Sequence, residues 1–406
     1  GERGEREMAT ATADELAEQF AALAALAAEE RKEAMEKLPA ERKFLLQQYN
    51  QKVARGMADI NMVLKLLKPL DESPDEPVPT MAVLASLACC PGMSPIGGEA
   101  EPDPLQKIEA AFMEHALETD ANAYKDVHDK IPPAARSTLL LLLYLLYQAK
   151  FHESGFELEG DLDERCEIAS QVAIRILVQC QRAIVETRWV QPTLALYRTS
   201  ALLGNGLWSG SDLTCVKRMR AILAADDLAY PDVSLRVHVH AGLTVGGDPE
   251  RVPFLSMDEF AAKPVGRLLP GKPVYLEVEL TRKHAQDALD GQPVLSLATD
   301  SSAGKGGEGA SNAERTAAAA RSVVEAYWLV VEGLKDDPEP NAMVHHQPMT
   351  VTSVATESVR ARTRFAAPPP GSYTLRVHVL SSSVAGIALL KDVDFVVEED
   401  DVPELS

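Results

Sequence analysis

The stretch Ala326-Tyr327-Trp328-Leu329-Val330-Val331 is the densest apolar run in the second half of the chain, and it predicts the first of a series of β-strands. One later segment, residues 373–379, alternates apolar and polar side chains, as a strand with one solvated face does. The turn Pro368-Pro369-Pro370-Gly371 stands before it. Short strands at this spacing predict a β-sandwich of immunoglobulin or fibronectin-III type, with Trp328 as an anchor of its core.

The same alternation occurs upstream, in residues 233–240 and 273–281, which predict two more strands. Two strands cannot hide a hydrophobic face alone, so we assign both to the same sandwich. The intervening segment 283–322 is polar and rich in Ser, Gly and Ala, which indicates an insertion. The expected α+β organisation is an amphipathic helix or linker at 1–35, a helical domain with a helix-loop-helix at 36–228, a split sandwich at 229–282 and 323–398, the insertion at 283–322, and an acidic tail at 399–406.

The N-terminal half shows helical spacing of its apolar residues instead. The predicted helices cover residues 38–68, 81–89, 104–119, 134–150, 161–188, 192–203 and 212–225. The helix at 161–188 is expected to bury a stripe of residues spaced by four, namely Ile168, Val172, Ile176, Cys180 and Ile184. The longest apolar run, residues 138–147, is about half of a bilayer span, so it predicts a buried helix and not a membrane-spanning one.

The chain has 406 residues and a formal net charge of −21. This charge argues against nucleic acid as a main partner, because phosphate binding needs a basic surface, and it is compatible with a basic protein partner. The five cysteines follow no disulfide or zinc spacing, which predicts reduced, cytosolic thiols. The chain begins at Gly1, so we expect a fragment. The candidate partner-binding residues are the acidic ones near the C-terminus: Glu398, Glu399, Asp400, Asp401 and Glu404.

Three patterns resemble chemical sites, and each has a simpler structural explanation. Residues 304–309 match the dinucleotide fingerprint by letter, but they lie in the polar insertion and not in a βαβ unit. His345 and His346 are adjacent and so point to opposite faces of a strand, while His238 and His240 share a face without a Cys or Glu cluster. All four are predicted to be solvated. We therefore predict no catalytic residue, no metal site and no cofactor, and an enzyme with an unrecognised site in the helical half is the open alternative.

Several short motifs occur here in a specific combination. They are Leu162-Asp163-Glu164-Arg165, Arg188-Trp189-Val190-Gln191-Pro192-Thr193-Leu194, Gly206-Leu207-Trp208, Tyr230-Pro231-Asp232-Val233, Ala326-Tyr327-Trp328-Leu329, and Arg364-Phe365-Ala366-Ala367-Pro368 followed by Gly371-Ser372-Tyr373. Across residues 36–398 they resemble the cytosolic region of the Sec sixty-three family, the J-domain-bearing translocation proteins of the endoplasmic reticulum membrane. The last hairpin keeps the family's Gly, as Gly386, but lacks its two acids and its Tyr.

The resemblance implies a non-enzymatic subunit at the cytosolic face of the endoplasmic reticulum membrane. Such a subunit docks on the Sec sixty-one channel and supports post-translational import, and its acidic tail is expected to hold the basic end of Sec sixty-two. The family's J-domain recruits the lumenal Hsp70, but no His-Pro-Asp triplet occurs here, so the J-domain and the transmembrane helices are expected to lie outside this chain. The structural anchors that the resemblance implies are Trp208, Tyr230, Trp328, Phe365, Tyr373 and Gly386.

A second family offers the same fold with a different biology. Units with a helical part, a helix-loop-helix and a sandwich also occur as scaffolds in spliceosomal helicases of the Brr-two type. Those proteins carry helicase motifs upstream, and none is found in this sequence. The negative net charge also opposes contact with RNA. The helicase scaffold therefore remains the alternative interpretation.

Overall fold

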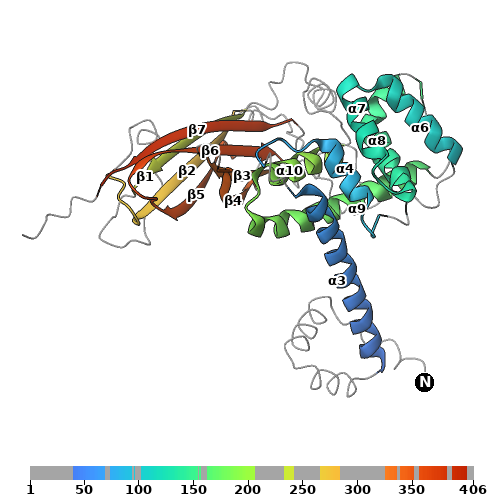
Figure 1. Cartoon of the computed structure of the whole chain (residues 1–406), viewed down its shortest axis with the longest axis horizontal. Helices are drawn as coiled ribbons and strands as arrows, with labels where there is room; N and C mark the ends of the chain where they lie inside the picture. Colours follow the sequence, from blue (N-terminus) through green and yellow to red (C-terminus); the bar gives the residue numbers. More distant parts are fainter. Residues whose placement is uncertain are drawn as a thin grey trace, which may run out of the picture.

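A computed structural model shows a mixed α+β fold, with helices in the N-terminal half and two antiparallel sheets in the C-terminal half (Figure 1). Helix α3 (Ala40–Leu67) projects away from the rest of the helices in this view. The structure describes residues 40–68, 74–93, 96, 102–153, 155–156, 162–205, 233–241, 266–283, 325–335, 339–351, 356–381 and 386–399.

The predicted helix or linker at 1–35 and the helix predicted at 212–225 lie outside the described residues. The other described helices follow the sequence prediction with one exception. They are α4 (Thr80–Ala88), α6 (Pro102–His115), α7 (Glu118–His128), α8 (Pro133–Glu153), α9 (Leu162–Ala183), the 3-10 helix η1 (Ile184–Thr187) and α10 (Val190–Asn205). Helix α7 was missed, because the helix predicted at 104–119 breaks after His115 and a new one starts at Glu118. Among its 11 residues only Ala121 and Tyr124 are buried, so its sequence carries little apolar periodicity.

Helix α9 and the following η1 bury only part of the predicted stripe, since Ile176, Cys180 and Ile184 are buried as predicted. The prediction is wrong at its start, where Ile168 is 42% exposed. A helix turns about 100° per residue, so a strict spacing of four drifts by about 40° at each step and leaves the core. The core positions of the helix are Cys166, Ala169, Ala173 and Leu177, together with the predicted Ile176 and Cys180.

The apolar run in α8 is buried, as the sequence predicted. Leu139, Leu141 and Leu142 have no exposed surface, and Phe112 packs edge to face on Tyr147 with ring centroids 5.0 Å apart. Among the described helices, the segment Glu164–Thr187 is long and apolar enough to cross a membrane by length and composition. The core helix of a soluble protein passes the same test.

The strands form two separate antiparallel sheets. They are β1 (Val233–His240), β2 (Pro273–Arg282), β3 (Glu325–Gly333), β4 (Ala342–Val351), β5 (Ser358–Ala366), β6 (Gly371–Ser381) and β7 (Ala388–Val397). The three-stranded sheet has the order β1-β2-β5, and the four-stranded sheet has the order β4-β3-β6-β7. Alternate residues from both sheets, such as Leu276, Leu329 and Val377, join one hydrophobic core. We call the two sheets together the β unit.

Helix α10 joins the helical half to the β unit (Figure 1). One side of it packs on α9 and α4, and the other side packs on the outer face of the four-stranded sheet. The N–H group of Met343 also donates to the carbonyl of Arg188 over 3.1 Å, where the chain takes a left-handed turn with φ 59°. We call this contact the seam, and its residues are Val190, Leu194, Tyr197, Trp328, Val330, Met343 and Leu380.

Trp328 lies in the seam and not between the two sheets, so its predicted place in the sandwich core is wrong. Neighbouring residues of a strand point to opposite faces, and Tyr327 and Leu329 on either side take the core positions. The Trp328 indole stacks on the ring of Tyr197, with centroids 4.5 Å apart and 15° between the ring planes. The ring of His346 lies 5.6 Å from it. The residue is therefore an anchor of the helix–sheet contact.

Candidate partner-binding surface

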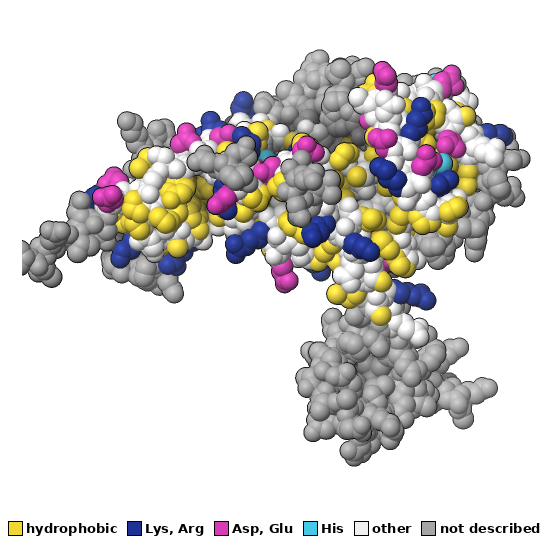
Figure 2. Space-filling model, viewed as in Figure 1, with side chains coloured by type: hydrophobic (Ala, Val, Ile, Leu, Met, Phe, Trp, Pro, Cys, Tyr) yellow, Lys and Arg dark blue, Asp and Glu magenta, His cyan; other side chains and the backbone are white. Residues whose placement is uncertain are grey.

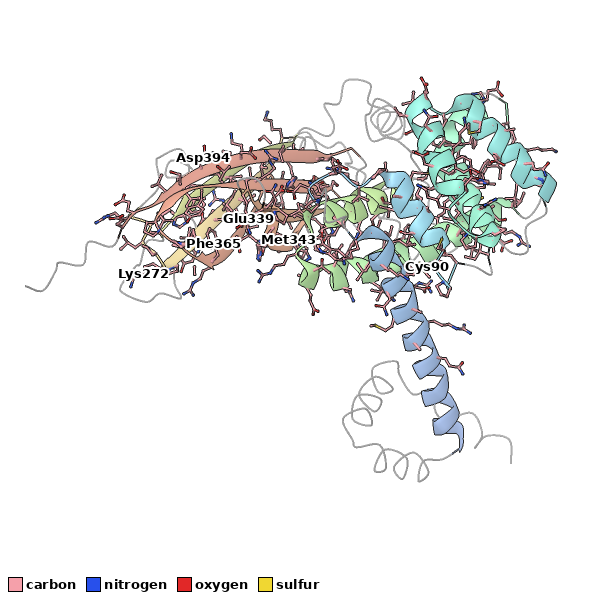
Figure 3. All side chains as sticks on the ribbon, in the orientation of Figure 1. Cys90, Lys272, Glu339, Met343, Phe365 and Asp394 are labelled. Carbon is pink, nitrogen blue, oxygen red and sulfur yellow. The ribbon has the colours of Figure 1, made fainter. Side chains whose placement is uncertain are left out.

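The charged side chains of the β unit include many basic ones, although the whole chain has a net charge of −21. Figure 2 shows Lys and Arg side chains beside Asp and Glu over the β unit in this view. Figure 3 places Phe365 on the three-stranded sheet, Lys272 just before β2 and Asp394 on β7, while Met343 lies at the junction with the helices. The acidic character of the chain is therefore not uniform over its surface.

The outer face of the three-stranded sheet carries a ladder of paired charges. The inner face of the same sheet is apolar and belongs to the core, so the polar side chains of the three strands share the other face. Antiparallel pairing sets these side chains in rows across the sheet. We call them the ionic face, and the rows are Arg236–Glu279–Arg360, His238–Glu277–Arg362 and His240–Tyr275–Arg364.

Glu279 sits in the centre of the first row and is 1% exposed. It accepts hydrogen bonds from the Ser358 hydroxyl over 2.7 Å and from Nε of Arg360 over 2.9 Å, and it forms an ion pair with Arg236. Burial alone would raise the pKa of the Glu279 carboxyl, but the hydrogen bonds from Ser358 and Arg360 and the two guanidinium charges hold that pKa below its usual range. The carboxylate is thus buried in its charged form.

Glu277 occupies the corresponding place in the second row and is also 1% exposed. Arg362 donates to its carboxylate through Nε over 2.8 Å and through a second nitrogen of the same guanidinium. Nε2 of His240 lies 3.4 Å from the same carboxylate oxygen. The Arg362 guanidinium also lies 5.6 Å from the ring centroid of Tyr275, within cation–π range. Each buried acid on this face therefore has a guanidinium beside it.

The histidines of β1 are buried, so the prediction that they are solvated is wrong. His238 is 7% exposed and His240 has no exposed surface. The ring of His240 stacks between its neighbours, 5.9 Å from His238 and 5.6 Å from Tyr275. Burial lowers the pKa of both histidines, and the nearby Glu277 carboxylate only partly opposes this effect.

We expect the protein to lose stability as the pH falls below about 6.5, the ordinary pKa of histidine. His238 and His240 have a lower pKa in the folded state, so the unfolded chain takes up their protons first. Each such histidine changes the free energy of unfolding by at most about 1.4 kcal/mol per pH unit. Urea unfolding at several pH values between 5 and 7.5 measures this slope. A His240→Gln variant with the same slope as the parent chain would contradict the assignment.

Glu398, the first residue of the predicted acidic partner-binding site, already has a partner within the chain. Glu398 forms an ion pair with Arg267, and its N–H group donates to the carbonyl of Leu268 over 2.8 Å. Arg267 also donates to the backbone carbonyl of Glu399 over 3.3 Å. Both side chains of the ion pair are about half exposed, so solvent screens the contact. The three remaining acids of the predicted site lie outside the described residues: Asp400, Asp401 and Glu404.

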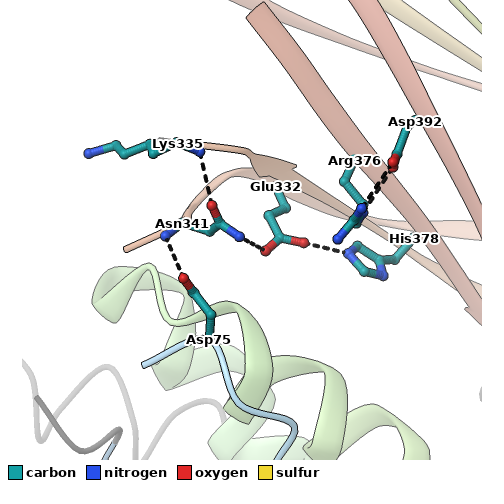
Figure 4. Close-up of polar contacts among 7 residues, drawn as sticks. All are labelled: Asp75, Glu332, Lys335, Asn341, Arg376, His378 and Asp392. Carbon is teal, nitrogen blue, oxygen red and sulfur yellow. Dashed lines mark hydrogen bonds and ion pairs between the residues drawn. The ribbon is translucent and has the colours of Figure 1, made fainter. Parts of the chain in front are cut away.

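A second polar cluster ties the β unit to the helical half (Figure 4). Glu332 is 1% exposed, and its carboxylate contacts Nε2 of His378 and the side-chain amide of Asn341, each over 2.9 Å. The backbone N–H of Asn341 donates to Asp75, in the chain leading to α4, over 3.2 Å. This cluster could not be predicted from the sequence, because Asp75 and Asn341 are remote in the chain. Its contacts fix the relative position of the two halves.

The buried thiols have the properties of core residues. Cys90 and Cys180 have no exposed surface, and burial is the main cause that raises the pKa of both thiols, to about 12 for Cys180. A thiol with such a pKa stays protonated at neutral pH and is a poor nucleophile. Within the described part of the chain, no group of three His, Cys, Asp or Glu side chains is placed to hold a metal ion.

The remaining predicted anchors fall into two groups. Tyr373 stacks on Phe395 with centroids 5.5 Å apart, and its hydroxyl donates to the carbonyl of Pro369 over 2.8 Å. Phe365 meets the same Phe395 edge to face at 6.1 Å, and Gly386 takes a left-handed conformation with φ 92°. The other two, Trp208 and Tyr230, lie outside the described residues, as do residues 304–309 of the predicted insertion.

Comparisons with known proteins do not identify a family for this chain. No family model matches the chain, and no curated protein matches it. Among solved structures, the alkylpurine DNA glycosylase AlkC of Pseudomonas fluorescens, bound to DNA containing an abasic site analogue, is similar at 12% identity and a TM-score of 0.19. That match covers 86% of this chain and 96% of the other. A likeness at this TM-score carries no argument about function.

Proposed function

We propose that the chain is a non-enzymatic docking subunit of the protein-translocation machinery at the cytosolic face of the endoplasmic reticulum membrane, related to the Sec sixty-three family. The resemblance of its motifs over residues 36–398 is the basis of the assignment. The proposed partners are the Sec sixty-one channel and, through the acidic tail, the basic end of Sec sixty-two.

The strand order supports a fibronectin-III-like sandwich for the β unit. A three-stranded sheet β1-β2-β5 beside a four-stranded sheet β4-β3-β6-β7 is the arrangement expected of this type of sandwich. The shared core between the sheets agrees with it. Domains of this type mostly bind other proteins, which favours docking over catalysis.

The observation that carries the proposal is the seam between α10 and the β unit. It brings the segment Arg188 to Leu194, one of the resembling motifs, against Trp328 of another such motif. Two motifs that are far apart in the sequence thus meet in one interface. This is the expected result if both belong to one scaffold that presents the β unit to a partner.

A pull-down with the full chain tests the proposal. We expect the purified chain to capture the detergent-solubilised Sec sixty-one channel, and a Trp328→Ala variant that has lost the seam to capture less of it. A folded chain that captures no channel would contradict the translocation assignment. Capture of spliceosomal proteins by the same chain would then favour the helicase-scaffold alternative.

A shortened chain tests the role of the acidic tail. Ending the chain after Glu399 removes Asp400, Asp401 and Glu404 but keeps the contacts of Glu398 with Arg267 and Leu268. We expect unchanged thermal stability and about tenfold weaker binding of a lysine-rich peptide at low salt, because the lost attraction is electrostatic and screened by ions. Equal affinity of the two chains at low salt would remove this role from the tail.

A further inference from the structure

Strand β7 forms one edge of the four-stranded sheet. It is the last strand in the order β4-β3-β6-β7, and in the view of Figure 1 it lies along one margin of the β unit. Among the described residues, β7 pairs with β6 alone, and beyond its end the N–H group of Glu398 donates to the carbonyl of Leu268. The backbone groups on the other side of residues 388–397 therefore have no hydrogen-bond partner in the described part of the chain.

This edge lacks two features that often prevent the addition of another strand. The register between β6 and β7 contains no bulge, and β7 contains no proline over its 10 residues. Two aliphatic side chains of the strand, Leu390 and Val396, are 58% and 57% exposed. A long, regular edge with exposed aliphatic side chains is a template for pairing with another chain.

The outer side of β7 presents two acidic side chains between these two aliphatic ones. Asp392 is paired with Arg376 of β6, with Nε of the arginine 2.9 Å from the carboxylate. Asp394 accepts a hydrogen bond from the Thr374 hydroxyl over 2.7 Å and forms no ion pair with any described residue. Residues at alternate positions of a strand share a face, and the exposed series on this face reads Leu390, Asp392, Asp394 and Val396.

From these observations we infer that β7 is a docking edge for an extended basic segment of a partner protein, which adds to the sheet as a further strand. Backbone hydrogen bonds supply the affinity of such a strand, and its alternate side chains supply the specificity. These side chains are spaced by ~6.6 Å, so apolar ones meet Leu390 and Val396 while lysine or arginine meets Asp392 and Asp394. The docking edge is separate from the acidic tail and does not depend on the proposed translocation role.

A basic partner fits this edge better than a second copy of the chain. In an antiparallel pair of two β7 strands, the register that sets Leu390 opposite Val396 also sets Asp392 opposite Asp394 twice. A parallel pair in register sets each acid beside its own copy, and like charges at such positions destabilise a sheet. The net charge of −21 also makes two copies repel each other and attracts a basic segment. The two acids therefore protect the edge against self-association and select the partner.

The test uses fluorescence anisotropy with the full chain and a labelled peptide of the sequence Val-Thr-Lys-Thr-Lys-Thr-Val. Two further peptides carry backbone N-methyl groups, one on every Thr and the other on every Val and Lys. All three have the same charge, but the N–H groups of an added strand point toward β7 only at alternate residues. We therefore expect the unmodified peptide and one methylated peptide to bind, and the other methylated peptide not to bind.

Variants of the chain locate the binding. Asp394→Lys and Leu390→Lys should each weaken binding of the unmodified peptide about tenfold, because each sets a positive charge beside the lysines of the peptide. The matched control is Asp126→Lys, which makes the same charge change as Asp394→Lys at an exposed position of α7 and should leave binding nearly unchanged. Equal thermal stability of the variants shows that each is folded.

Several results would overturn the inference. Failure of the unmodified peptide to bind at low salt would do so. Equal binding of the two methylated peptides would indicate attraction between charges without an added strand, such as attraction to the acidic tail. Equal weakening by Asp394→Lys and Asp126→Lys would indicate a nonspecific effect of net charge. A dimer of the full chain in analytical ultracentrifugation that Leu390→Lys dissociates would assign the edge to a second copy.

Discussion

Replacing Trp328 by alanine is expected to lower the free energy of unfolding by about 3 kcal/mol, the low end of the range for removing a large aromatic side chain from a packed site. The low end applies because Trp328 is only partly buried. The indole nevertheless fills the seam, where it stacks on Tyr197 at 4.5 Å and meets His346 at 5.6 Å. Urea unfolding followed by circular dichroism measures the change.

The number of unfolding transitions in Trp328→Ala is as informative as the loss of stability. Because Trp328 lies between α10 and the β unit, its loss should uncouple the two halves, and unfolding should separate into two transitions. Tyr197→Phe is the matched control. It keeps the stacked ring and removes a buried hydroxyl that has no hydrogen-bond partner among the described residues, so stability should stay the same or rise. A loss below about 1 kcal/mol in Trp328→Ala, in one transition, would contradict the role of the seam.

The same residue shows what the sequence could and could not predict. The run from Ala326 to Val331 predicted a strand, and β3 is that strand. Its continuous apolar character came from burial on both faces, since Tyr327 enters the core while Trp328 and Val330 meet α10. A sequence shows that two faces exist, but it does not show which of them a helix from another part of the chain covers. The strand was therefore predictable and the place of Trp328 was not.

The ionic face could not be predicted from the sequence, for a related reason. Strands β1 and β2 were predicted from their alternation, and the two histidines of β1 were expected to be solvated. Glu277 and Glu279 are buried because arginines from β5, about 80 residues later, pair with them. The side chains that a strand residue meets depend on the strand order and register of the sheet. The periodicity of a single segment does not determine that register.

Glu279→Gln is expected to destabilise the protein by about 3 kcal/mol, because it leaves two guanidinium groups beside each other without their shared carboxylate. The side chain keeps its shape and loses only its charge, so packing is nearly unchanged. Arg236 is 37% exposed and Arg360 28% exposed, so water partly screens their repulsion, and we take the low end of the range for breaking a buried pair. Thermal and urea unfolding measure the loss.

The exposed pair of Lys335 and Glu339 supplies the control. Its side chains are 45% and 69% exposed, and Glu339→Gln should lower the free energy of unfolding by less than about 1 kcal/mol.

The pH dependence of stability provides a second test of the role of Glu279. The pKa of Glu279 is lowered in the folded state, so its contribution is complete above about pH 4.3 and is lost as the pH falls through the folded pKa. The difference between the parent chain and Glu279→Gln should therefore shrink in acid, and a constant difference would contradict the charged state of Glu279.

A triple variant separates two contributions to stability: the attraction between the charges of the first row, and the free-energy cost of leaving one of them without its partner. Replacing Glu279, Arg236 and Arg360 together by methionine removes every charge of the row while keeping side chains of similar length. Desolvation offsets most of the attraction in buried ion pairs, so the triple variant should recover most of the stability that Glu279→Gln loses. Equal losses in both variants would instead mean that the row itself stabilises the fold. Recovery would mean that the acids of the ionic face mainly neutralise the neighbouring guanidinium groups and add little net stability.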